Sequence, residues 1–275
     1  MRVAVTGASG FIGSRLVAEL RDRGAEVLAL PRRTPSDLSG VDAVINLAGE
    51  PLAQRWNANV KQRIRSSRVE GTKALAEAIA RSDPQPRVLV SASAAGYYGD
   101  RGEEELDESS PPGDDFLASL CVDWEHAADS AGVRVVKIRT GIVLDRGGGA
   151  LKQMLPPFRA GLGGPIAGGR QYMPWISLED IVGIYLTALS DDAWSGAVNG
   201  AAPTPVTNSE FTRALGRALR RPAVIPVPAF ALKALYGEMA SVITAGQRMV
   251  PRRALELGYE FRRAALDEAL QAALA

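Results

Sequence analysis

Short apolar segments alternate with longer amphipathic ones through the first half of the chain. The apolar segments have the length and composition of buried strands, and turns or polar loops bound them. They cover residues 3–5, 26–30, 42–47, 87–90 and 133–139. The amphipathic segments have the apolar spacing of helices and cover residues 11–23, 60–81 and 116–131. This alternation predicts an α/β fold with a doubly wound parallel sheet and helices on both faces.

Three glycines follow the first predicted strand directly. Gly7, Gly10 and Gly13 have the spacing G-x-x-G-x-x-G and lead into the first predicted helix. In a Rossmann fold such glycines allow a tight turn, close approach of the backbone to a pyrophosphate, and close packing of the helix on the strand. The helix N-terminus then favours the anion. We expect this turn to bind a dinucleotide; the alternative is a glycine-rich turn without a ligand.

The end of the second predicted strand indicates which dinucleotide binds. An NAD-binding protein usually carries an acidic residue there, about 20 residues beyond the glycines, that bonds the ribose 2′-hydroxyl. No acidic residue occurs between Val27 and Ser36, and Arg32 and Arg33 follow the strand instead. A guanidinium can hold a 2′-phosphate that a carboxylate would repel. The sequence therefore favours NADP(H); the alternative is that both arginines are solvated loop charges.

The carboxyl end of the third predicted strand carries Leu47, Ala48 and Gly49. Ligands of a doubly wound sheet lie off the carboxyl ends of its strands. These small or apolar residues are therefore candidates to pass beneath the adenosine and ribose, or else they form a plain turn.

The fourth predicted strand leads into Ser93, Tyr97 and Tyr98. Hydroxyl groups at the carboxyl end of a strand can polarise a carbonyl or relay a proton. The alternative is that Ser93 caps a turn and that the tyrosines line a wall, because hydroxyl-rich turns are common.

The pattern changes from Arg146 onwards, where glycine-rich and helical segments replace the alternation. A helix at residues 178–190 and a short strand at 197–200 are expected to return to the sheet, and a further helix is expected from Ala229 towards Gly246. We therefore expect a Rossmann domain at residues 1–145 plus about 173–200. A smaller, mostly helical substrate domain is expected at about 146–172 plus 201–275.

Composition excludes several classes of protein. A net charge of +1 over 275 residues gives no bulk attraction to nucleic acid or to an anionic membrane. Cys121 and His126 are the only residues of their kinds, which excludes an internal disulfide and the usual cysteine or histidine metal sites. No apolar run reaches the roughly 18 residues of a membrane helix. We expect a cytoplasmic protein that acts on a small molecule, without metal, nucleic acid or membrane; its oligomeric state is open.

Several short motifs together carry a specific resemblance. They lie at residues 6–13, 46–49, 55–56, 67–72, 96–99, 124–125, 163–166, 174–176 and 202–211. Over essentially the whole chain they resemble the extended short-chain dehydrogenase/reductase family, and most closely its epimerase-like branch with a C-terminal domain of unknown function. The resemblance implies NADP(H) bound by Gly7, Ser9, Gly10, Phe11, Ile12, Gly13, Arg32, Leu47, Ala48, Arg63, Arg68 and Ile142. It also implies that Ser93 is the catalytic serine.

The chain departs from the wider family in the helix predicted at residues 116–131. The family acts there through Tyr-x-x-x-Lys, and the lysine and the cofactor lower the pKa of a tyrosine that moves the substrate proton. Residues 115–125 contain neither Tyr nor Lys. Phe116 or Leu117 fills the tyrosine position, and Leu120 or Cys121 the lysine position, depending on the register. Neither Phe nor Leu can titrate.

Two hypotheses about function follow. The first is an NADP-dependent oxidoreductase or epimerase-like enzyme with a non-standard acid, in which Ser93 polarises a substrate oxygen and Tyr97 or Tyr98 moves a proton. The alternative is a non-catalytic NADP(H)-binding regulatory or sensor protein, which the missing Tyr-x-x-x-Lys pair favours. The fold alone does not decide between them.

Overall fold

Six parallel strands form the central sheet in the computed structural model, which describes residues 1–31 and 38–275. The strand order is β2-β1-β3-β4-β6-β10. Their bounds are β1 (Arg2–Thr6), β2 (Glu26–Ala29), β3 (Ala43–Asn46), β4 (Val88–Ala94), β6 (Arg134–Thr140) and β10 (Gly196–Gly200). The chain runs from β1 to β2 on one side and then to β3 on the other. This reversal makes the sheet doubly wound, as predicted, and places a crevice at the carboxyl ends of β1 and β3.

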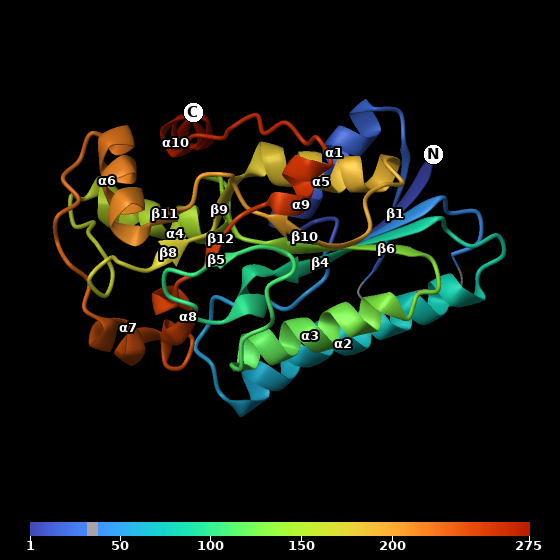
Figure 1. Cartoon of the computed structure of the whole chain (residues 1–275), viewed down its shortest axis with the longest axis horizontal. Coiled ribbons are helices and arrows are strands. Elements are labelled where there is room, and N and C mark those ends of the chain that lie inside the picture. Colours follow the sequence, from blue (N-terminus) through green and yellow to red (C-terminus); the bar gives the residue numbers. More distant parts are fainter. Residues whose placement is uncertain (32–37) are drawn as a thin grey trace.

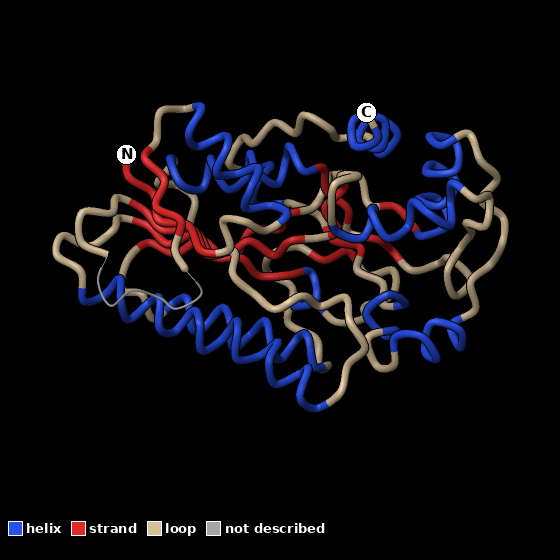
Figure 2. The backbone as a smooth tube through the Cα atoms, turned by 180° about the vertical axis from the view of Figure 1, so that it is seen from behind, coloured by secondary structure: helices blue, strands red, loops and turns tan. Residues whose placement is uncertain are grey.

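Helices cover both faces of the sheet (Figures 1 and 2). The helices α1 (Phe11–Asp22) and α5 (Leu178–Ser190) lie on one face, and α2 (Ala58–Arg81) and α3 (Phe116–Asp129) lie on the other. Side chains of a strand alternate between the two faces. Val3 and Val5 of β1 accordingly join the core beneath α1 and α5, whereas Ala4 joins the core beneath α2.

The remaining elements lie mostly beyond the end of the sheet that is remote from the N-terminus (Figure 1). Most are short, and three two-stranded ladders, β7–β9, β8–β11 and β5–β12, connect them. The strands are β5 (Glu105–Leu106), β7 (Ile142–Leu144), β8 (Tyr172–Met173), β9 (Trp175–Ser177), β11 (Val206–Thr207) and β12 (Arg248–Met249). The helices are the 3-10 helix η1 (Ala95–Tyr98) and α4 (Gly149–Arg159), α6 (Asn208–Leu219), α7 (Ala229–Tyr236), α8 (Ala240–Thr244), α9 (Arg252–Glu256) and α10 (Leu266–Leu274).

The prediction of a single helix from Ala229 towards Gly246 is wrong, because this segment forms two helices. Gly237 has a φ of 63° and divides the segment into α7 and α8. A glycine adopts this left-handed conformation at little cost, so the chain turns there instead of continuing the helix.

The C-terminal tail returns to α5 after α9. Asp180 of α5 is fully buried, and its carboxylate accepts hydrogen bonds from the backbone N–H groups of Arg262 (2.7 Å) and Arg263 (3.0 Å). The Tyr259 hydroxyl donates to the Asp180 carbonyl at 3.0 Å. The tail therefore packs on a helix that covers the central sheet.

The division into two domains stays a prediction. Its expected bounds are residues 1–145 plus about 173–200 for the Rossmann domain, and about 146–172 plus 201–275 for the substrate domain.

Replacing Gly13 with alanine is expected to destabilise the protein. A Cβ atom at this position would lie 2.1 Å from the Gly7 carbonyl oxygen, so α1 would have to move away from the turn. Overpacking of this kind costs about 1–3 kcal/mol. The matched control is Gly71→Ala in α2, where a Cβ would meet nothing within 4 Å and helix propensity predicts a gain of about 0.5–1 kcal/mol. Urea unfolding followed by circular dichroism measures both; equal effects of the two substitutions would contradict the close packing at Gly13.

Candidate active site

The turn between β1 and α1 has the features that an anion-binding turn needs. Gly7 has a φ of 66°, and a Cβ there would lie 2.7 Å from the Leu47 carbonyl oxygen. Gly10 is the N-cap of α1, and no side chain of the described chain caps the helix or places a carboxylate in its first turn. The backbone N–H groups at this end of α1 are therefore available to an anion, and the helix dipole favours one.

The loop after β3 lies between this turn and α2. Leu47 and Ala48 donate their backbone N–H groups to the Thr6 hydroxyl, at 3.1 and 3.2 Å. A Cβ on Gly49 would lie 2.9 Å from the guanidinium of Arg68. The structure thus brings together three predicted cofactor segments, namely the glycine turn, residues 47–49 and Arg68.

The two arginines predicted on α2 lie in different surroundings. Arg68 donates to the Glu50 carbonyl oxygen at 3.0 Å, and its guanidinium lies 5.2 Å from the centre of the Trp124 ring. Burial lowers the pKa of Arg68, although Cys121 and Glu50 act in the opposite direction. Arg63 has a side chain that is 55% exposed and forms an ion pair with the Glu50 carboxylate. Arg68 therefore faces the candidate site, and Arg63 lies at its rim.

The other predicted cofactor residues differ in their burial and in what they contact. Ser9 is exposed, Ile12 packs against the core beneath α1, and Ile142 begins β7. Phe11 lies against the start of α4, because a Cβ on Gly148 would come within 2.3 Å of its ring. Two predicted residues lie outside the described part of the chain: Arg32 and Arg33.

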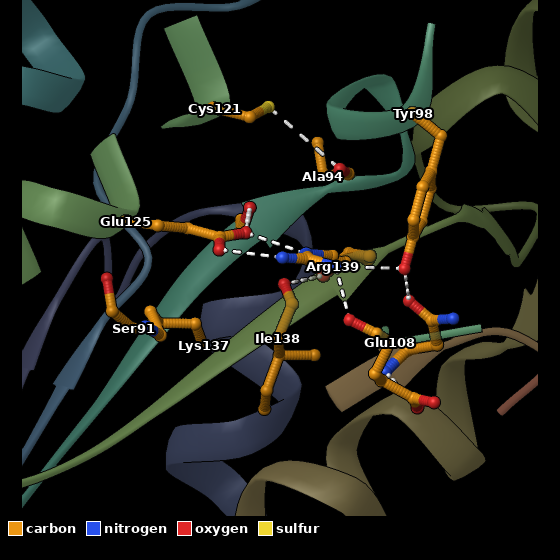
Figure 3. Close-up of polar contacts among 12 residues, drawn as sticks. Ser91, Ala94, Tyr98, Glu108, Cys121, Glu125, Lys137, Ile138 and Arg139 are labelled. Carbon is orange, nitrogen blue, oxygen red and sulfur yellow. Dashed lines mark hydrogen bonds and ion pairs between the residues drawn. The ribbon is translucent and has the colours of Figure 1, made fainter. Parts of the chain in front are cut away.

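Ser93 belongs to a buried network of polar side chains. Figure 3 shows two members of this network, Glu125 and Arg139. The Ser93 hydroxyl donates to Glu125 Oε1 at 2.7 Å. Arg139 holds both carboxylate oxygens, with Nε–Oε1 at 2.9 Å and Nη2–Oε2 at 3.0 Å. The carboxylate directs the Ser93 proton towards itself, so the lone pairs of Ser93 Oγ are the part of the hydroxyl that can accept another hydrogen bond.

Tyr98 lies on the other side of Arg139 in Figure 3. Its hydroxyl accepts from Arg139 Nη1 at 3.0 Å and donates to Asn199 Oδ1 at 2.7 Å. Burial raises the pKa of Tyr98 to about 12. The phenol is therefore neutral and fully hydrogen-bonded, and Arg139 separates it from Glu125 and Ser93.

Tyr97 differs from Tyr98 in its burial and in its hydrogen bonding. Its ring lies over the guanidinium of Arg139, 3.4 Å from Cζ to the ring centre, and the side chain is half-buried. Its hydroxyl makes no hydrogen bond with the residues that the structure describes. The three predicted catalytic residues are thus gathered around Arg139, but only Tyr97 keeps a free hydroxyl.

A cleft of about 500 Å³ opens beside the N-terminus of α3. The start of α3, the helices α7 and α8, and the segment that leads into α2 form its walls. Leu117 lines the cleft and also contacts η1, since a Cβ on Gly96 would lie 3.1 Å from the Leu117 side chain. Leu117 therefore lies between the cleft and η1, which carries Tyr97.

No group of three or more His, Cys, Asp or Glu side chains within residues 1–31 and 38–275 could hold a metal ion. No helix there has the length and apolar character needed to cross a membrane.

Comparison with known families decides the relationship. A model described as the NAD dependent epimerase/dehydratase family matches residues 3–199. The chain belongs to this family. A second model, Domain of unknown function (DUF1731), matches residues 227–273 of this epimerase family member. The resemblance inferred from the motifs is therefore confirmed.

Relatives extend the match to the whole chain. Epimerase family protein SDR39U1 of Bos taurus is 44% identical over 294 residues, which is 100% of both chains. The chloroplastic SDR39U1 homolog of Arabidopsis thaliana is 42% identical over 99% of this chain and 86% of its own length. The crystal structure of human SDR39U1 (isoform2) with NADPH has a TM-score of 0.93 and 40% identity, and the match covers 99% of this chain and 98% of the human one.

A more distant solved structure is that of a nucleoside-diphosphate sugar epimerase from Corynebacterium glutamicum. It is 37% identical with a TM-score of 0.81, and the match covers 100% of this chain but 58% of that one. The fold is shared even with MoeE5 in complex with UDP-glucose and NAD, at 23% identity and a TM-score of 0.77 over 98% of this chain and 96% of that one.

The structure shows which residues of α3 face the end of β4 in this epimerase family member, whose α3 lacks the Tyr-x-x-x-Lys pair. Leu117 contacts the loop after β4, and Cys121 Sγ lies 3.9 Å from the Ala94 carbonyl oxygen (Figure 3). Phe116 instead packs edge-on against Trp56, with 5.4 Å between ring centres. Of the two predicted registers, these contacts favour the one with Leu117 at the tyrosine position and Cys121 at the lysine position. Burial raises the pKa of Cys121 to about 12, so neither side chain carries a charge at neutral pH.

Sequence reasoning did not select Glu125 and Arg139 as site residues of this family member. No signal in the sequence singled out Arg139, because the same strand, β6, also carries Arg134 and Lys137. Glu125 stood in a family motif at residues 124–125, but its partner could be identified only from the structure. Both side chains are almost fully buried, at 7% and 5% exposure.

Replacing Arg139 with methionine is expected to lower the free energy of unfolding by about 3–5 kcal/mol, because the Glu125 carboxylate would stay buried without its partner. The double variant Glu125→Leu/Arg139→Met is expected to lose less than the sum of the two single variants. Urea denaturation measures all three. The control is Arg217→Met in the exposed Arg217–Asp267 pair, with an expected loss of at most about 1 kcal/mol. A loss at Arg139 no larger than at Arg217 would contradict this role of the ion pair.

Proposed function

We propose that this chain is an NADP(H)-dependent, epimerase-like oxidoreductase of the extended short-chain dehydrogenase/reductase type that acts on a small molecule. The observation that carries the proposal is the turn at residues 7–13, whose glycines leave room for a pyrophosphate at an uncapped helix N-terminus. The NADPH in the crystal structure of human SDR39U1, at 40% identity, supports the choice of cofactor. When bound, NADP(H) supplies or accepts a hydride at C4 of its nicotinamide. A cytoplasmic location stays a prediction.

Each part of the cofactor has candidate residues in this chain. The backbone at Gly7, Gly10 and Gly13 would hold the pyrophosphate, and residues 47–49 would pass beneath the adenosine and its ribose. Arg68 would supply a positive charge beside Cys121, where the wider family has its lysine. For the 2′-phosphate we propose Arg32 and Arg33 on the basis of the sequence.

The double variant Arg32→Ala/Arg33→Ala is expected to bind NADPH about 10–100-fold more weakly, because charge-assisted hydrogen bonds contribute about 1.5–3 kcal/mol. NADH lacks the 2′-phosphate, so its affinity is expected to stay the same. NADPH and NADH fluorescence titrations measure both. Arg23→Ala, an exposed arginine after α1, is the control. A parallel loss of both cofactors would show that the two arginines do not read the 2′-phosphate.

The proton chemistry that we propose depends on Ser93 and Tyr97. The Ser93 Oγ lone pairs accept a hydrogen bond from a substrate hydroxyl while Glu125 holds the serine proton. The free hydroxyl of Tyr97 is the candidate proton donor to a different substrate oxygen, a carbonyl oxygen that becomes a hydroxyl on reduction, and solvent then returns a proton to Tyr97. Tyr98 is a positioning residue in this scheme, because its raised pKa and its hydrogen bonds with Arg139 and Asn199 keep it neutral and fixed.

A screen of carbonyl and sugar substrates, read by NADPH absorbance, tests this function. With a substrate found, Ser93→Ala and Tyr97→Phe are each expected to lower kcat by about 10²–10⁴-fold, the range of general acid–base catalysis, without changing the NADPH affinity. Tyr98→Phe is expected to lower the free energy of unfolding and to have only a small effect on kcat. Unchanged turnover in both Ser93→Ala and Tyr97→Phe would exclude this assignment of roles.

The second candidate function is an NADP(H)-binding regulatory or sensor protein without turnover. Leu117 and Cys121 favour it, because neither can titrate at neutral pH where the family has its catalytic pair. Tight NADPH binding without turnover of any substrate class would support it. Catalysis that is abolished by Ser93→Ala would exclude it.

A further inference from the structure

Two segments that are far apart in the sequence contact each other at the cleft beside α3. Trp56 and Gly237 form an isolated parallel bridge. Arg55 Nη1 donates to the Ala234 carbonyl oxygen at 3.1 Å. Lys61 and Glu238 form an ion pair. Three contacts therefore join the end of α7 and the residues after it to the segment before α2 and the first turn of α2.

The walls of the cleft are largely apolar. Trp56 and Phe116 both line it, with their rings edge to face at an angle of 75°. Leu117 and Val242 add aliphatic surface. Aromatic and aliphatic walls of this kind favour a ligand with a flat or extended apolar body.

The charged groups that line the cleft differ in the hydrogen bonds and ion pairs that they form. The Asp115 carboxylate accepts from the backbone N–H of Ala118 at 2.8 Å and so caps α3. The Lys233 ammonium group has no ion pair or hydrogen bond within the described ranges 1–31 and 38–275. Lys61 lies 5.1 Å from the centre of the Phe116 ring, and its partner Glu238 has a side chain that is 64% exposed. An ion pair with so exposed a carboxylate is weakly held, because water solvates the carboxylate when the pair opens.

We propose that the cleft binds a small apolar carboxylate, whose anionic group replaces the Glu238 carboxylate on Lys61. The apolar body of this ligand lies against Trp56 and Phe116, and its far end lies at Leu117, next to the loop that carries Tyr97. Glu238 then competes with the ligand for Lys61, because its carboxylate pairs with the ammonium group when no ligand is bound. As a statement about the substrate class, this inference rests on the proposed function, whereas the binding itself does not require a cofactor.

The competitor role predicts opposite effects for the two members of the ion pair. Removing Lys61 removes the charge that attracts the ligand, so affinity for an anion falls. Removing the charge of Glu238 frees Lys61, so affinity for the same anion rises. A neutral ligand of the same shape is expected to respond to neither change, because it does not compete for the ammonium group.

Isothermal titration calorimetry of the full chain with 1-naphthoate and its neutral analogue 1-naphthamide, without NADP(H), tests the proposal. The unaltered protein is expected to bind 1-naphthoate about tenfold more tightly than 1-naphthamide, as a charge-assisted contact predicts. Lys61→Gln is expected to reduce this difference, and Lys233, which stays in the cleft, accounts for what remains. Glu238→Gln is expected to strengthen 1-naphthoate binding by at least about threefold and to leave 1-naphthamide unchanged. Asp267→Asn, in an exposed ion pair between α6 and α10, is the matched control and is expected to change neither affinity.

Three results would each overturn the proposal. They are no binding of 1-naphthoate, equal binding of the two probes, and an unchanged 1-naphthoate affinity in Glu238→Gln. Glu238 is exposed, so this variant decides the question even if Lys61→Gln does not fold. NADPH titration of the same preparations separates the two proposals. An unaltered protein that does not bind NADPH would count against the proposed function. An unaltered protein that binds NADPH but not 1-naphthoate would count only against the cleft ligand.

Discussion

The buried ion pair between Glu125 and Arg139 is the interaction on which the rest of the candidate site depends. Taking both charges out of water is expensive, and such a pair persists only where the remaining hydrogen-bonding groups are also satisfied. Here Ser93, Tyr98 and the Glu108 carbonyl oxygen complete the set. Burial alone would lower the pKa of Arg139, but the hydrogen bonds and charge of Glu125 outweigh it and hold the pKa above its ordinary value. The pair thereby fixes α3, β4 and β6 relative to one another.

The parts of the molecule that could be predicted are those that the sequence encodes locally. The strand, the glycine turn and the start of α1 occupy the first thirteen residues, and the roles of Gly7 and Gly13 follow from backbone geometry alone. The parallel sheet follows from alternation along the chain. The network around Arg139 could not be predicted, because its members come from separate elements and meet only once the sheet has formed. The cleft has the same limitation, since Trp56 and Gly237 lie 181 positions apart in the sequence.

The register of α3 sharpens what the missing Tyr-x-x-x-Lys pair means. Leu117 and Cys121 face the end of β4, so both catalytic positions of the wider family are filled by uncharged side chains. The positive charge near Cys121 belongs to Arg68, on a different helix. A catalytic role for this site therefore has to be built from the hydroxyl groups at the end of β4, and the structure separates these groups clearly. Tyr98 is committed to the buried network, whereas the Tyr97 hydroxyl is free of any partner in the described chain.

The return of the C-terminal tail to α5 limits how this protein can evolve. The carboxylate of Asp180 is fully buried and takes two of its hydrogen bonds from backbone N–H groups of the tail, at residues 262 and 263. A gene fusion or exchange that replaced the tail with an unrelated sequence would leave this carboxylate buried and short of donors, at a considerable cost in stability. The tail is therefore not an interchangeable module, because the tail and α5 have to be inherited, and to change, together.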